Sequence, residues 1–275
     1  MMMKLNTFQL KVIALICMVI DHIAAFIPGT PIWFRYIGRL SAPIFLFCLV
    51  WGMEYTRNRT KYILRLLGAA IGMEIFWVVI HRVFDFHTYS NHNNIFLTFF
   101  CVGVLIELFF PREWKLKKIQ KILILVLISG AIVYGEWGLF GCVLGVLLYK
   151  FKNDPKTLAC AYIGCCAYYE LVSVTAFYAR LAYFTIYHLG VIGELFKALC
   201  VIMTGEIYAF TPMVFHGLYW GDFQWMMIGA LPFMLMYDGK VGRKCKWFFY
   251  IFYPSHLFIL MWIAKCVAGF SNASF

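Results

Sequence analysis

Long apolar segments recur along the whole chain and limit its fold more strongly than any other feature. A helix of about 20 apolar residues can cross a hydrocarbon core of roughly 30 Å. The 275 residues are 63% hydrophobic and only 13% charged, far more apolar than an average soluble domain. The sequence therefore predicts an all-α, multi-pass transmembrane helix bundle that occupies residues 1–275 as a single domain.

The order of apolar and basic segments predicts the topology. We expect membrane spans at about 9–27, 37–53, 62–80, 94–110, 119–135, 137–150, 157–178, 223–237 and 247–268. Basic residues follow every second span, which places those loops and the N-terminus in the cytoplasm. The last basic loop, which carries Lys240 and Arg243, lies on the same side only if 181–220 crosses twice, or once with a re-entrant segment. We therefore expect about eleven helices, with ten as the alternative, and an external C-terminus. The short span at 137–150 is punctuated by glycines, which favours a close-packed helix or a half-helix.

The net charge of +11 does not indicate a nucleic-acid partner, because the basic residues cluster in short loops between spans. The ten cysteines lie almost wholly in apolar segments without paired spacing. We interpret them as buried packing thiols and expect neither a disulfide framework nor a metal site.

An acid and an imidazole stand side by side in the first span, at Asp21 and His22. On insertion scales a charged side chain at the centre of a bilayer costs roughly 2.5–3.5 kcal/mol, so such residues usually have a function. Arg39 lies at a comparable depth in the second span, and Asp21 is its expected anionic partner. The other ionisable residues expected within the membrane are Glu74, Glu107, Glu194, Glu206, His188, His216 and His256. Glu107 lies close to a span end and is expected to reach the interface.

The two histidines of the first and last spans, His22 and His256, are candidates for a general base. Asp21 would orient the base, and Arg39 would stabilise developing negative charge. Pro254 precedes His256 and can kink its helix, which would help to form a cavity. The residues leave open which histidine is the base.

Several ordered motifs resemble the TraX family, and they span nearly the whole chain. They are LKVIA (10–14), MVIDHI (18–23), YIGRLSAPIF (36–45), YTRNR (55–59), KYILRL (61–66), NIFLT (94–98), YGEWG (134–138), YDGKVGR (237–243) and FFYIFYPSH (248–256). One departure is Trp51, which stands where the family pattern has an acidic residue before Gly52. Glu54 is the candidate replacement.

The resemblance implies a membrane acetyltransferase that uses cytoplasmic acetyl-CoA as co-substrate and contains no metal. The acceptor would be a peptide N-terminus, a glycan or a small molecule, at a bacterial-type cytoplasmic membrane. The basic clusters could attract the phosphates of the coenzyme, through Arg57, Arg59, Lys61, Arg65, Lys240 and Arg243. Membrane lipids are the other expected partner, and a homo-oligomer is left open.

Two other functions fit the same residues. Buried Asp, Glu and His side chains also serve as proton relays in transporters, although the chain shows no internal repeat. The third hypothesis is a non-catalytic assembly protein. Uptake into proteoliposomes that does not depend on acyl-CoA would favour a transporter, whereas binding of acetyl-CoA would count against an assembly protein.

Overall fold

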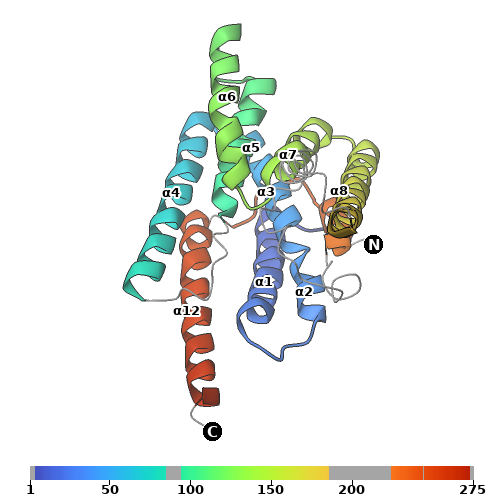
Figure 1. The fold of residues 1–275 in the computed structure, drawn as a ribbon. Helices are drawn as coiled ribbons and strands as arrows, with labels where there is room; N and C mark the ends of the chain where they lie inside the picture. Colours follow the sequence, from blue (N-terminus) through green and yellow to red (C-terminus); the bar gives the residue numbers. More distant parts are fainter. Residues whose placement is uncertain (1–3, 85–93, 186–223, 244, 273–275) are drawn as a thin grey trace. The chain divides into compact units, whose positions relative to one another are not determined.

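The structure, a computed structural model, describes residues 4–84, 94–185, 224–243 and 245–272. Within these ranges the chain is helical and contains no strand, and an isolated β-bridge joins Leu5 to Tyr237. The helices are α1 (Thr7–Phe26), α2 (Trp33–Gly38), α3 (Ser41–Tyr55), α4 (Arg59–Val83), α5 (Ile95–Phe109), α6 (Lys118–Tyr134), α7 (Gly138–Phe151), α8 (Pro155–Thr185), η2 (Gln224–Ala230), α11 (Leu231–Leu235) and α12 (Lys246–Asn272) (Figure 1). The predicted all-α, multi-pass fold is confirmed.

The apolar helices differ in length. Among the described residues, four segments are long and apolar enough to cross a membrane, at Thr7–Phe26, Trp33–Tyr55, Arg59–Val83 and Trp247–Val267. Helices α6 and α7 form a pair bent by 118°, which adds a fifth crossing if the pair is one broken span. Helix α5 and the pair η2–α11 are shorter apolar helices. The expected double crossing at 181–220, together with His188, Glu194, Glu206 and His216, lies outside the described residues except for 181–185 at the end of α8.

The bend between α6 and α7 depends on small residues. Gly138 adopts a φ of +46°, a conformation that L side chains rarely adopt. A Cβ at Gly141 would lie 2.7 Å from Cβ of Trp137 and 2.9 Å from Cγ2 of Thr98. The expectation of a close-packed helix at 137–150 is confirmed, because a side chain at residue 141 would push α7 off its neighbours.

The chain divides into two compact units, each built from separate stretches. The first unit contains Met1–Cys48, Ile75–Ser90 and Leu218–Phe275, and the second contains Leu49–Glu74 and Asn91–Gly217. The expectation of a single domain stays a prediction.

The first unit brings together segments from the N-terminal and C-terminal parts of the chain. Helix α1 packs against α2 and α12 (Figure 1). The backbone N–H of Leu5 donates to the Met236 carbonyl at 2.8 Å, and the N–H of Thr7 donates to the Lys240 carbonyl at 2.9 Å. Asn6 begins α1 with a capping box, in which its side chain accepts from the backbone N–H of Gln9. These bonds anchor the start of α1 beside the segment that precedes α12.

Candidate functional site

A carboxylate held by two guanidinium groups lies in the first unit. Nη2 of Arg39 is 2.8 Å from Oδ1 and 3.0 Å from Oδ2 of Asp21, and Nη1 of Arg35 is 3.1 Å from Oδ1. Nη1 of Arg35 also donates to the Asp21 backbone carbonyl at 3.3 Å. The predicted pairing of Asp21 with Arg39 is therefore confirmed. All three side chains are half-buried.

Gly38 makes this close approach possible. It ends α2, is buried, and faces the Asp21 side chain. A Cβ at residue 38 would overlap that side chain. The glycine between Arg35 and Arg39 thus lets both arginines reach one carboxylate.

The two candidate histidines meet in the same unit. Nδ1 of His22 lies 2.7 Å from Nε2 of His256, and the rings stack with centroids 4.9 Å apart. Nδ1 of His256 lies 2.9 Å from the Phe252 carbonyl oxygen. His256 is only 6% exposed, whereas His22 is half-buried. Pro254 lies inside α12, which continues through it to present His256.

The structure corrects one expected role. We expected Asp21 to orient a histidine base, but among the described residues its carboxylate bonds only to the two arginines. His22 is oriented instead by His256. Adjacent residues on a helix point about 100° apart, so Asp21 and His22 face different neighbours. We call Asp21, His22, Arg35, Arg39 and His256 the histidine–arginine cluster.

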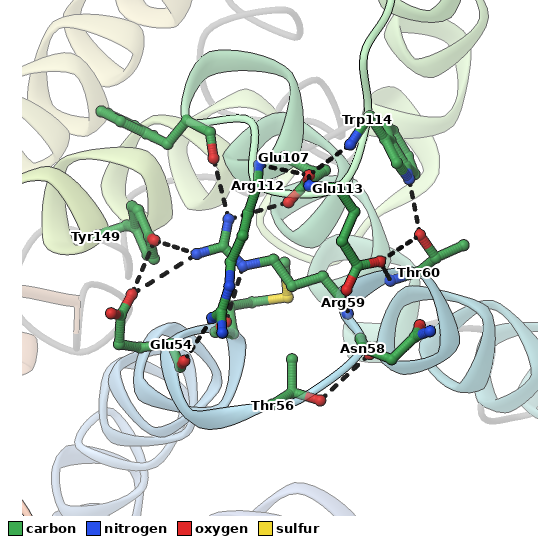
Figure 2. Close-up of polar contacts among 12 residues, drawn as sticks. Glu54, Thr56, Asn58, Arg59, Thr60, Glu107, Arg112, Glu113, Trp114 and Tyr149 are labelled. Carbon is green, nitrogen blue, oxygen red and sulfur yellow. Dashed lines mark hydrogen bonds and ion pairs between the residues drawn. The ribbon is translucent and has the colours of Figure 1, made fainter.

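A second polar group of side chains lies in the second unit and surrounds Arg59 (Figure 2). Nη1 of Arg59 is 2.9 Å from Oε2 of Glu107 and 3.0 Å from the Phe110 carbonyl. Its Nε donates to the Met53 carbonyl at 3.0 Å, and its Nη2 donates to the hydroxyl of Tyr149. Arg59 is 2% exposed. Its guanidinium is thus occupied by groups of the chain itself.

Glu107 is the buried counter-charge of Arg59. Its Oε1 accepts from the backbone N–H groups of Arg112, Glu113 and Trp114 at 2.8, 2.6 and 3.0 Å. Glu107 is 0% exposed, so its carboxylate is bound by protein groups, and the expectation that it reaches the membrane interface stays a prediction. Three N–H donors and one guanidinium stabilise the carboxylate where the sequence suggested only water.

Glu113 binds the first residues of α4 from the loop that follows α5. It accepts from the backbone N–H of Arg59 at 2.6 Å and from the N–H and hydroxyl of Thr60 at 3.0 and 2.8 Å. The Thr60 backbone N–H is the largest cause that lowers the pKa of Glu113. An acidic side chain is favourable there, because the first N–H groups of a helix have no intrahelical partner.

Glu54 completes this second group. Its Oε2 accepts from the hydroxyl of Tyr149 at 2.9 Å and lies 3.6 Å from both Arg59 Nη2 and Lys152 Nζ. The candidate replacement for the missing acid at Trp51 therefore participates in a charged network. We call Glu54, Arg59, Glu107, Glu113 and Tyr149 the Arg59 network.

The other basic residues predicted to bind a coenzyme stay accessible. Arg57, Lys61, Lys240 and Arg243 are exposed, and Arg65 is half-buried with its guanidinium 5.4 Å from the centroid of the Tyr62 ring. Arg57 and Lys61, which follow α3, are therefore accessible to an anion from solution. Among the described residues, no group of three His, Cys, Asp or Glu side chains is arranged to hold a metal ion.

Three members of these two groups were missed from the sequence, namely Arg35, Glu113 and Tyr149. Arg35 lies four residues before Arg39, a spacing that puts both on one helical face, and this signal could have identified it. Tyr149 carries no such signal, because it lies 90 residues from Arg59 in the chain.

Comparison with known proteins supports the resemblance of the motifs. The family model described as "TraX protein" matches residues 7–264. The chain is 26% identical over 267 residues to the "Probable fimbrial assembly protein FimC, serogroup H1" of Dichelobacter nodosus. The aligned region covers 93% of this chain and 94% of that protein. No solved structure matches the chain significantly.

Proposed function

Since the chain belongs to the TraX family, we propose that it is a membrane-embedded acyltransferase. It would transfer an acetyl group from cytoplasmic acetyl-CoA to an amine or hydroxyl of an exported acceptor. The observation that carries the proposal is the contact between His22 and His256, which unites imidazoles from the first and last described helices. Acyl transfer needs a base that removes the acceptor proton, and imidazole suits this at neutral pH.

The charges beside the histidines suit the same reaction. Arg35 and Arg39 together carry two positive charges against the single carboxylate of Asp21. The excess positive charge favours a tetrahedral intermediate, whose oxygen becomes negative when the acceptor attacks the thioester carbonyl.

The coenzyme would bind through its phosphates to exposed basic residues. Lys240 and Arg243 belong to the same unit as the histidines, and Arg57, Lys61 and Arg65 are the other candidates. Arg59 is set apart from this role, because its guanidinium already bonds to Glu107 and Tyr149. Phosphate binding at the other residues would depend on ionic strength, because exposed charges are screened by salt.

The relative from Dichelobacter nodosus suggests one class of acceptor, since its name assigns it to fimbrial assembly. We therefore propose the N-terminal amine of a fimbrial subunit as the first acceptor to test, followed by hydroxyl acceptors. The proposed location is the cytoplasmic membrane with the N-terminus in the cytoplasm, as the basic loops predict.

The test is acetyl transfer by the purified full-length protein in lipid nanodiscs. Acetyl-CoA is supplied with peptides that carry a free or a blocked N-terminus, and products are measured by mass spectrometry. Acetylation of the peptide with a free N-terminus, but not of the peptide with a blocked N-terminus, supports an amine acceptor. No release of coenzyme thiol with any acceptor, combined with no binding of acetyl-CoA, would contradict the proposal.

A further inference from the structure

The hydrogen bonds of the two histidines determine where their protons lie. A backbone carbonyl can only accept, so Nδ1 of His256, 2.9 Å from the Phe252 carbonyl, carries the proton. In a neutral imidazole the other nitrogen then has a lone pair and accepts a hydrogen bond. Nε2 of His256 lies 2.7 Å from Nδ1 of His22, which must therefore donate.

This arrangement of donors and acceptors leaves one nitrogen of the histidine pair with a free lone pair. When Nδ1 of neutral His22 carries the proton, its Nε2 has the lone pair. Among the described residues, no side chain or backbone group forms a hydrogen bond with that atom, and the His22 ring is half-buried. Both nitrogens of His256 are occupied, and its ring is buried and stacked on Phe252 with centroids 5.2 Å apart.

Aromatic rings keep His22 in this orientation. Phe26 and Tyr253 contact its ring edge to face, each with a centroid distance of 6.2 Å. Such contacts restrict the ring flip that would exchange Nδ1 with Cδ2 and Nε2 with Cε1 and so break the hydrogen bond to His256. The ring is thus positioned by His256 on one side and by aromatic neighbours on others.

We propose that Nε2 of His22 is the atom that accepts the acceptor's proton, and that His256 is a positioning residue that determines the tautomer of His22. This assignment rests on the proposed acyl transfer. The X–H bond of the acceptor breaks as Nε2–H forms on His22, and the lone pair of X attacks the thioester carbonyl carbon. The carbon–sulfur bond then breaks, and His22 returns the proton to the sulfur. Throughout, Nδ1–H of His22 continues to donate to His256.

The tautomer can be measured without any activity. The full-length protein is labelled with ¹⁵N in the imidazole rings, reconstituted in lipid and studied by NMR at neutral pH. The resonance that disappears in His22→Asn is expected to show a protonated Nδ1 and an unprotonated Nε2. The opposite tautomer at His22 would overturn the assignment.

Two matched variants test the roles in catalysis. The amide of His22→Asn lies near the position of Nδ1 and can still donate to His256, but no basic Nε2 remains. We expect acetyl transfer to fall about 10²–10⁴-fold, the usual contribution of a general base. His256→Gln retains an acceptor near Nε2 and should keep kcat within about tenfold, whereas His256→Phe should lower kcat with little change in KM.

The outcomes separate this proposal from the proposed function. If the wild-type protein transfers no acyl group, the proposed function fails and the catalytic assignment fails with it, whatever tautomer is observed. If the wild-type protein is active, full activity of His22→Asn would overturn this proposal alone. Loss of activity in His256→Gln as severe as in His22→Asn would also contradict it.

Discussion

The histidine–arginine cluster and the Arg59 network contain similar residue types but differ in what they leave unsatisfied. In the Arg59 network, Glu107 accepts four hydrogen bonds and all three guanidinium nitrogens of Arg59 donate hydrogen bonds. In the histidine–arginine cluster, the half-buried His22 retains a nitrogen without a described hydrogen-bond partner. A saturated buried network stabilises a fold, whereas a basic atom without a partner can exchange a proton with a substrate.

The two groups also differ in the share of backbone groups among their hydrogen-bond partners. The Arg59 network fastens the loop after α5 to the turn between α3 and α4, partly through backbone donors. The histidine–arginine cluster consists mostly of side-chain contacts between helices. Substitutions in the Arg59 network should therefore lower mainly the stability of the protein, and substitutions in the histidine–arginine cluster should lower mainly its activity.

The largest expected effect on stability comes from opening the Arg59 network. Replacement of Arg59 by Met leaves the Glu107 charge buried without its guanidinium, which costs about 3–5 kcal/mol in comparable buried pairs. We expect a large fall in the apparent Tm, measured by thermal unfolding in detergent. Lys61→Met on the exposed face of the same helix is the control and should change Tm little. Equal Tm values for the two variants would show that the network is not structural.

A smaller loss is expected when the carboxylate of the histidine–arginine cluster is neutralised. Asp21→Asn removes charge-assisted hydrogen bonds to Arg35 and Arg39. A hydrogen bond to a charged group contributes about 1.5–3 kcal/mol to the free energy of unfolding. The loss should be smaller than in Arg59→Met, because these side chains are half-buried, whereas Arg59 and Glu107 are 2% and 0% exposed. The measurement is the apparent Tm in the same detergent. A Tm below that of Arg59→Met would reverse the comparison.

The packing of the histidine–arginine cluster can be tested at one glycine. Gly38→Ala places a methyl group in the volume of the Asp21 side chain and should cost about 1–3 kcal/mol. Gly68→Ala is the matched control in α4, where a Cβ would meet no atom within 4 Å. Alanine at residue 68 should leave stability unchanged or raise it, because it favours the helix. The apparent Tm of both variants is measured by thermal unfolding. A lowered Tm for Gly68→Ala together with a wild-type Tm for Gly38→Ala would contradict the close contact between Gly38 and Asp21.

The smallest effect concerns pH. The pKa of Glu113 is lowered, so its contribution is present at neutral pH and is lost as the pH falls through the lowered value, below the ordinary Glu pKa of about 4.3. Glu113→Gln should therefore lower Tm slightly at neutral pH and make the acid side of the Tm profile flatter. The profile is measured by thermal unfolding across mildly acid pH. Parallel profiles for wild type and variant would exclude this linkage.

Local properties made much of the molecule predictable. The apolar runs placed most helices within a few residues of their observed bounds, since hydrophobic length is a property of a single segment. The pairing of Asp21 with Arg39 was also predictable, because an isolated charge in an apolar span requires a partner at similar depth. The partners of Glu107 were not predictable. Its partners include backbone donors of a loop, and loop geometry is not encoded in hydropathy.

By itself, the sequence determined that this protein is a multi-pass helical membrane protein and which costly side chains it carries in its spans. Only the tertiary structure decided which of those side chains meet. His22 and His256 are 234 residues apart, and Arg59 lies 90 residues from Tyr149. Hydrophobic patterns drive helices into the membrane, but hydrogen bonds between distant helices depend on how those helices pack. Those bonds pair His22 with His256 and bury Arg59 beside Glu107.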